Sequence, residues 1–191
     1  MTDLTLPMEI LNSLREATRQ LHTDIEKDNT ANKIMDHSIS LEDYKLLLFQ
    51  NFLAYKAAES EIEKFLPNYG TDKTQRLQKD LENLGIRNFN GELEFTCNSE
   101  AEAIGAAYVI EGSAMGGMLI GKELKNCEAL KSMESQHYFN GERSSMQGWN
   151  KFLKYLRSQE FEPAQITAAE NKAKETFLLF KKAFQFQLSD C

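Results

Sequence analysis

Proline and cysteine are both scarce in this chain of 191 residues, which contains three of each. Because proline interrupts helical hydrogen bonding, its scarcity leaves long stretches free to form helices. The cysteines Cys97, Cys127 and Cys191 are scattered, odd in number, and lack CxxC or Cys/His spacing. We therefore expect reduced thiols in a cytoplasmic protein, and neither disulfides nor a zinc site.

The chain also lacks an excess of positive charge and long apolar runs. Its net charge is −7 and its pI is near 5.1, which disfavours nucleic acids and anionic membranes as partners. It has no run of 18 apolar residues, so we expect no membrane span. The first residues, MTDLTLPMEI, show no basic segment followed by an apolar one, so we expect no signal peptide.

Helical periodicity dominates what is present. Apolar residues make up 41% of the chain, enough for a sizeable core. The pattern and its caps predict helices over 8–27, 40–65 and 72–84, from 99 through the glycine-rich segment, over 149–157, and from 163 to about 184. We expect loops over 86–98 and 132–147. We expect one all-α domain over 1–191, with its core at about 8–187, built as an irregular bundle of six to eight helices.

His22 lies inside the first predicted helix, with Glu26 one turn later. A carboxylate at i+4 can hold a neutral imidazole in one tautomer and one orientation, as an axial ligand of haem iron requires. An ordinary contact on the helix surface gives the same spacing. The spacing alone leaves both interpretations open.

A cluster of helical glycines, Gly112, Gly116 and Gly117, is the second unusual feature. Each glycine costs about 1 kcal/mol relative to alanine inside a helix, so together they cost about 3 kcal/mol. Close helix packing or a kink offsets that cost in some proteins. A flat ligand lying directly on the backbone offsets it in others. A phosphate-binding loop is disfavoured, because no strand precedes the segment and GxGxxG is not matched.

Four segments together carry a resemblance to a known family. They are LREATRQLHTDIE (14–26), YKLLLFQNFLAYKAAESEIE (44–63), AAYVIEGSAMGGMLIGKEL (106–124) and EPAQITAAENKAKETFLLF (162–180). The chain resembles the haem oxygenases from about residue 10 to 187. The bacterial branch, which includes the enzymes associated with bacteriophytochromes, is the most similar in pattern.

The resemblance implies a role for each matching residue. His22 falls at the position of the proximal iron ligand, with Glu26 as the acidic residue beside it. Residues of the distal helix, whose backbone covers the haem face, correspond to Gly112, Ser113, Gly116 and Gly117. Basic contacts to the haem propionates correspond to Arg15, Lys151 and Lys154, and pocket tyrosines to Tyr55 and Tyr108. Ser113 stands where animal haem oxygenases have a distal aspartate.

The activity implied is O2-dependent cleavage of haem to biliverdin, CO and Fe2+. Haem is then both cofactor and substrate, and electrons come from an external reductase such as ferredoxin or flavodoxin. The resemblance to the bacteriophytochrome-associated branch also suggests a bilin-binding photoreceptor as a partner. The alternatives are a haem-binding or haem-storage protein of the same fold, a thiaminase-like helical bundle with a catalytic cysteine or carboxylate cluster, and a pure interaction module.

Overall fold

The computed structural model describes residues 6–27, 29–134 and 136–188, and within these ranges it contains helices and no strand. The α-helices are α1 (Leu6–Lys27), α2 (Asn32–Met35), α3 (Leu41–Phe65), α4 (Lys73–Asn83), α5 (Glu100–Gly112), α6 (Ala114–Glu123), α7 (Gln147–Arg157) and α8 (Pro163–Ala183). Three short 3-10 helices are η1 (Leu124–Asn126), η2 (Glu128–Leu130) and η3 (Arg143–Met146). The predicted all-α fold is confirmed.

The helix starts follow the predicted capping signals. Ser40 Oγ accepts a hydrogen bond from the Asp43 N–H at 3.0 Å at the start of α3. Ser99 Oγ accepts one from the Glu102 N–H at 3.2 Å at the start of α5. Each bond satisfies a backbone donor that the first helical turn leaves unpaired. α8 begins at Pro163, where a missing N–H has no consequence.

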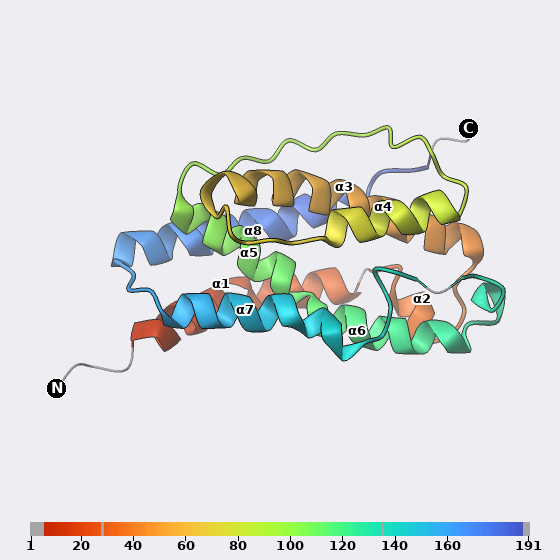
Figure 1. The fold of residues 1–191 in the computed structure, drawn as a ribbon, viewed down its shortest axis with the longest axis horizontal. Helices are drawn as coiled ribbons and strands as arrows, with labels where there is room; N and C mark the ends of the chain where they lie inside the picture. Colours follow the sequence, from red (N-terminus) through yellow and green to blue (C-terminus); the bar gives the residue numbers. More distant parts are fainter. Residues whose placement is uncertain (1–5, 28, 135, 189–191) are drawn as a thin grey trace.

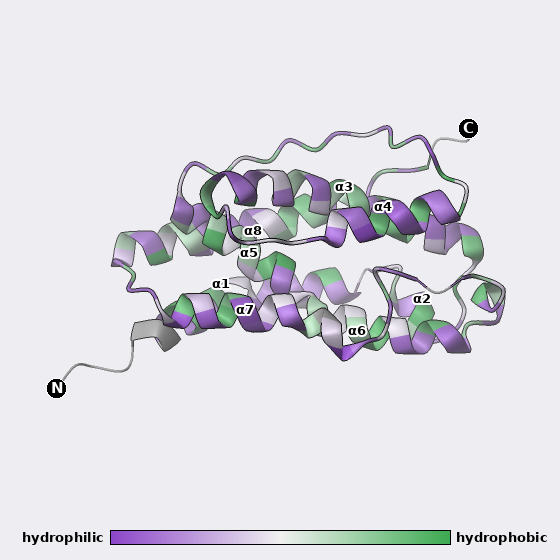
Figure 2. Ribbon diagram, viewed as in Figure 1, coloured by the Kyte–Doolittle hydropathy of each residue, from purple (hydrophilic) through white to green (hydrophobic). Residues whose placement is uncertain are grey.

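The bundle has two groups of helices, seen one above the other in Figure 1. In that view α3, α4 and α8 form the upper group and α1, α6 and α7 the lower, with α5 between them. α5 packs closely on α8, because a Cβ at Gly105 would lie 2.0 Å from the Ala169 carbonyl oxygen. α1 also packs on α8. Most helices carry both hydrophobic and hydrophilic residues, as amphipathic helices do (Figure 2).

The segment 84–98 is an extended loop that runs along α3 (Figure 1), so the expectation of no strand there is confirmed. Phe89 packs on Phe52 of α3 with ring centroids 4.9 Å apart. The Cys97 N–H donates to Glu61 Oε2 at 3.1 Å. Cys97 and Cys127 are buried free thiols, as expected, and Cys191 lies outside the described residues.

One feature, the short helix α2, differs from the sequence-based expectation. α2 was not predicted, because four residues are too few to show helical periodicity. His37 is exposed, has a φ of 61°, and its Nε2 lies 2.8 Å from Glu123 Oε2. This contact ties the end of α2 to α6.

One helical run, Glu100–Asn126, is long and apolar enough to cross a membrane by length and composition. Its mean hydropathy is 1.4 although it contains no uninterrupted apolar stretch of 18 residues. Half of this apolar window is buried inside the protein, and the run includes the buried Glu111. These properties are those of a core helix in a bundle.

Candidate functional site

A cleft of about 560 Å3 lies between α1 on one side and α5 and α6 on the other. Its volume falls within the range of about 300–1,000 Å3 that is usual for cofactor sites. Most of the site residues predicted from the sequence line this cleft, namely Arg15, His22, Glu26, Tyr108, Gly112, Ser113, Gly116 and Gly117. The fold therefore brings together residues from two segments about ninety positions apart.

His22 lies on the α1 wall of the cleft, and its side chain is 58% exposed. Its Nδ1 is 3.5 Å from Glu26 Oε2, and its ring meets Phe177 of α8 edge-on, with centroids 5.8 Å apart. The carboxylate attracts the Nδ1 side of the ring, and Phe177 limits its rotation. This arrangement leaves Nε2 as the nitrogen available to a ligand in the cleft.

The opposite wall is made of backbone. A Cβ built at Gly116 would meet no protein atom within 4 Å, and at Gly112 or Gly117 its nearest neighbour would be an aromatic carbon 3.9 Å away. Packing between helices therefore does not require glycine at these three positions. Each of them lines the cleft, so the missing side chains leave space there.

Three hydroxyl groups form a hydrogen-bonded chain at this wall. Tyr138 OH donates to Tyr55 OH at 2.7 Å, Tyr55 OH pairs with Ser113 Oγ at 2.7 Å, and Ser113 Oγ donates to the Ile110 carbonyl at 2.7 Å. Burial raises the pKa of Tyr55 to about 12 and that of Tyr138 well above its usual value. Both phenols are therefore neutral donors at ordinary pH.

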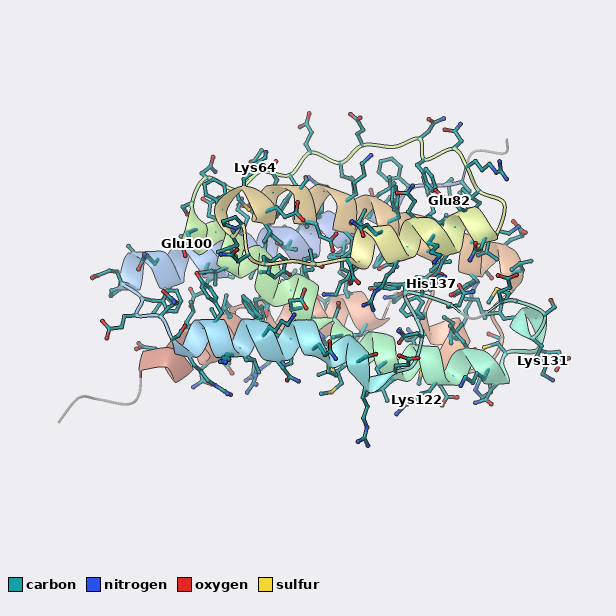
Figure 3. The ribbon with its side chains drawn as sticks, viewed as in Figure 1. Lys64, Glu82, Glu100, Lys122, Lys131 and His137 are labelled. Atoms are coloured by element: carbon teal, nitrogen blue, oxygen red, sulfur yellow. The ribbon has the colours of Figure 1, made fainter. Side chains whose placement is uncertain are left out.

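The Tyr138 segment is held by a buried carboxylate of α4. Asp80 is fully buried and accepts hydrogen bonds from the backbone N–H groups of His137 and Tyr138, each at 2.8 Å. Burial raises the pKa of Asp80, although the two backbone donors oppose the shift. Figure 3 shows His137 beside α4, where this contact fixes the loop.

Basic and polar side chains gather where Tyr108 faces α1. Arg15 and Arg19 both line the cleft from α1. Burial raises the pKa of Tyr108, while a hydrogen bond with Thr18 and the charge of Arg15 oppose this shift. Trp149 of α7 packs against the Tyr108 ring with centroids 6.0 Å apart. This part of the cleft suits an anionic group on a flat ligand.

Lys151 and Lys154 do not line the cleft, and their contact with its ligand stays a prediction. Trp149 is the α7 residue that faces the cleft, and residue 151 lies about 200° further around a helix of 3.6 residues per turn. Lys151 lines a separate hollow near α4 instead. The sequence resemblance did not fix the register of this helix.

Several lining residues were not predicted as site residues. They include three aromatic residues of α8 at helical spacing, Phe177, Phe180 and Phe184, which all line the cleft. A stripe at helical spacing looks the same whether it faces core or ligand, so the sequence carries no signal that separates the two. The other lining residues missed include Arg19, Asn51, Tyr138, Phe139 and Trp149.

The lining also bears on the thiaminase-like alternative. Among the lining residues that the structure describes, Glu26 is the single acid and there is no cysteine. Cys97 lies in the loop along α3, and burial raises the pKa of its thiol to about 11. Neither a nucleophilic cysteine nor a carboxylate cluster is therefore found in the described part of the cleft.

Known structures share this fold at low sequence identity. The heme oxygenase of Neisseria meningitidis, in its NO- and CO-bound forms, is 19% identical, with a TM-score of 0.69 over 95% of this chain and 94% of that one. Heme oxygenase-1 of Synechocystis sp. PCC6803, in complex with heme, is 16% identical, with a TM-score of 0.66 over 92% and 90%. The heme oxygenase of Leptospira interrogans is 19% identical, with a TM-score of 0.64 over 92% and 98%.

The family of the chain is shown by its match to a protein-family model. No curated protein sequence matches the chain. The family model described as heme oxygenase matches residues 8–186, which is nearly the whole chain. The match spans both walls of the cleft, including the α1 segment with His22 and the glycine-rich segment of α5 and α6. The chain therefore belongs to the haem oxygenase family.

Proposed function

We propose that the protein is an active haem oxygenase, which cleaves haem to biliverdin, CO and Fe2+ with O2 and externally supplied electrons. One observation carries the proposal: a cleft has an imidazole on one wall and three glycines on the other, and packing does not explain these glycines. A flat macrocycle with a central metal suits such a cleft, because the metal needs a ligand on one face and close backbone is tolerated on the other.

His22 is the proposed proximal ligand. A neutral imidazole suits haem that binds O2, whereas a thiolate ligand favours O–O cleavage. Glu26, whose Oε2 lies 3.5 Å from Nδ1, keeps this second nitrogen oriented. Phe177 holds the ring from the other side.

The distal wall is formed by Gly112, Gly116 and Gly117, whose backbone can approach the macrocycle without steric conflict. Ser113 replaces the aspartate of animal relatives, and its hydroxyl lies in the chain with Tyr55 and Tyr138. In our proposal this chain holds hydrogen-bond donors at the wall without placing a strong acid beside the ligand. The aromatic rings of α8 limit the access of water.

The propionate groups are the anionic part of haem, and we assign them to the end of the cleft with Arg15 and Arg19. Guanidinium groups bind carboxylates through paired hydrogen bonds, so they can set the rotation of the macrocycle. Tyr108 supplies a neutral hydroxyl on the same side. Lys151 and Lys154 are left out of this assignment because they lie outside the cleft.

Bound haem would supply both the iron that activates O2 and the carbon skeleton that is cleaved. We propose a cytoplasmic location and an external electron donor of the ferredoxin or flavodoxin type. The bilin product would suit a photoreceptor that binds it, which is the partner suggested by the resemblance to the bacteriophytochrome-associated branch.

A haem-binding or storage protein of the same fold is the second candidate, because the cleft alone explains binding. The two functions separate when haem is added to the purified protein, followed by ascorbate or a reductase system. Loss of the Soret band with the appearance of bilin absorbance is the result we expect. A Soret band that persists under reduction and O2 would identify a binding protein instead.

A further inference from the structure

A second hollow, of about 210 Å3, adjoins the cleft between α4, the α5–α6 junction and the start of α7. We call it the side chamber. The cleft and the side chamber have three lining residues in common, Ser113, Gly117 and Tyr138. Its outer lining includes the exposed residues Asp72, Ser144, Gln147 and Lys151. The side chamber thus extends from the molecular surface to the distal wall of the cleft.

A buried ionic cluster lines the side chamber. Glu111 is 3% exposed, and its Oε1 accepts hydrogen bonds from Tyr69 OH at 2.7 Å and from Lys73 Nζ at 2.5 Å. The backbone of α7 makes room for the carboxylate, because a Cβ at Gly148 would lie 2.1 Å from Glu111 Oε2. A buried ion pair contributes little net stability relative to apolar packing, so stability alone does not explain this one.

The hydroxyl chain at the distal wall needs a source of protons. The chain runs through Tyr138, Tyr55 and Ser113 and ends at the Ile110 carbonyl, which can only accept a hydrogen bond. Burial raises the pKa of both tyrosines, so neither releases a proton at neutral pH. Ser113 also lines the side chamber, where ionisable groups are present.

We propose that Glu111, with Lys73 and Tyr69, is the ionisable end of a proton-supply route that runs from solvent through the side chamber to Ser113. The proposal rests on the haem oxygenase function proposed above. One water occupies about 30 Å3 of liquid, so the side chamber has room for several. A proton entering from solvent passes over waters held by the Glu111 carboxylate to Ser113 Oγ. The Ser113 hydroxyl breaks its hydrogen bond to the Ile110 carbonyl, turns, and releases its own proton toward the cleft.

The charges around Glu111 come from several elements. Tyr69 and Lys73 contact it directly, and the charge of Glu111 contributes to the raised pKa values of Tyr69 and Tyr55. Glu59 of α3 acts on the same two tyrosines. The remaining charged residues of the side chamber are Asp72, Arg76 and Lys151.

The direct test is Glu111→Gln in the haem-loaded protein, which keeps the shape of the side chain but removes the proton carrier. We expect the single-turnover rate of haem loss to fall by about 100-fold, with a larger solvent isotope effect. The pH midpoint of the ferric absorption spectrum should also move lower, because the substitution removes a negative charge and leaves the Lys73 ammonium. An unchanged rate and isotope effect would overturn the proposal.

Glu59→Gln is the matched control. Glu59 is also buried, at 6% exposure, and accepts hydrogen bonds from Thr71 Oγ1 and the Thr74 N–H, but it does not line the side chamber. We expect its turnover rate to remain within about twofold of the wild type. A loss as large as that in Glu111→Gln would show a general effect of buried charge and would contradict the route.

Chemical rescue gives a second measurement. Glu111→Ala opens space in the side chamber, so added formate should restore a measurable part of the rate if a carboxylate there carries protons. Absence of rescue together with an unchanged isotope effect would count against the route. Should Glu111→Gln fold poorly, the double variant Glu111→Gln/Lys73→Met removes the unpaired ammonium and permits the same measurement.

The outcomes separate the two proposals. A wild-type protein that keeps its Soret band under reduction and O2 would contradict the haem oxygenase function itself. A wild-type protein that degrades haem, beside a Glu111→Gln variant that does so equally fast, would contradict only the proton route.

Discussion

At the scale of single residues, the helical glycines fall into two groups according to what a Cβ would meet. At Gly121 it would lie 2.3 Å from the Gly141 nitrogen and 2.6 Å from the Phe139 oxygen, so the backbone of the neighbouring loop requires glycine there. At Gly116 it would meet nothing within 4 Å. Glycine at 121 thus serves the fold, and we infer that glycine at 116 serves a ligand.

Alanine substitution should therefore have opposite effects at these two positions. In the ligand-free protein, Gly116→Ala should raise the free energy of unfolding by about 1 kcal/mol through its better helix propensity. The same variant should bind haem about tenfold more weakly, because the methyl group occupies the slot. Chemical denaturation and haem titration measure the two effects.

Gly121→Ala is the control for this pair. It should lower the free energy of unfolding by about 1–3 kcal/mol, because backbone atoms must move to admit the methyl group. A Gly116→Ala variant that loses stability without haem, or that binds haem as tightly as wild type, would show that the glycine has a structural purpose.

At the scale of elements, α4 acts on the site without lining the main cleft. Its Asp80 accepts the N–H groups of His137 and Tyr138, and so fixes the loop that carries Tyr138 to Tyr55. Phe139 follows directly and lies against the cleft. The position of this hydroxyl chain thus depends on a helix outside the walls of the cleft.

Asp80→Ala should lower the free energy of unfolding by about 1–3 kcal/mol, because it leaves two backbone donors without their acceptor. It should also slow haem degradation by displacing Tyr138. The matched control is Asp72→Ala, an exposed carboxylate near the same helix that pairs with Arg76 and should change stability by less than about 1 kcal/mol. Equal effects of the two variants on stability and turnover would contradict the role of Asp80.

Local sequence signals predicted where most helices begin. They predicted less well which face of a helix points toward the cleft. Ser40, Ser99 and Pro163 each mark a helix start in sequence, and each does so in the structure, because caps act within one turn. α2 escaped prediction because it is a single turn. Lys151 lines the side chamber and Trp149 lines the cleft, because the α7 register depends on tertiary packing of Trp149, which no local pattern encodes.

At the scale of the whole molecule, the site depends on contacts between distant segments. His22 and Gly116 were both conspicuous in the sequence, and family resemblance placed them on opposite faces of one ligand. The side chamber and the Asp80 contact were not visible, because each joins residues more than thirty positions apart. Such contacts follow from the packed bundle and not from spacing along the chain.

The buried tyrosines make the fold sensitive to alkaline pH. Burial raises the pKa of Tyr55 to about 12, and raises those of Tyr69 and Tyr138 well above their usual values. In the unfolded chain these phenols ionise near pH 10. Their contribution to stability is therefore complete below about pH 10 and is lost as pH rises toward and beyond the folded pKa values.

We expect the free energy of unfolding to fall above pH 10 by up to about 1.4 kcal/mol per pH unit for each tyrosine. In Tyr55→Phe the free energy of unfolding should fall less steeply with pH, because one of the buried phenols that ionise on unfolding is absent. Denaturant titrations at pH 9, 10 and 11 provide the measurement. Identical slopes for the variant and the wild type would mean that Tyr55 is not protected from ionisation in the folded state.

The central claim is that His22 holds haem iron opposite a wall of glycine backbone. The most direct measurement is the absorption spectrum of the haem-reconstituted protein beside that of His22→Ala. We predict a Soret band typical of imidazole-ligated haem in the wild type, and its weakening or displacement in the variant, with imidazole added to the buffer restoring it. Identical spectra and equal haem affinity for the two proteins would contradict the account.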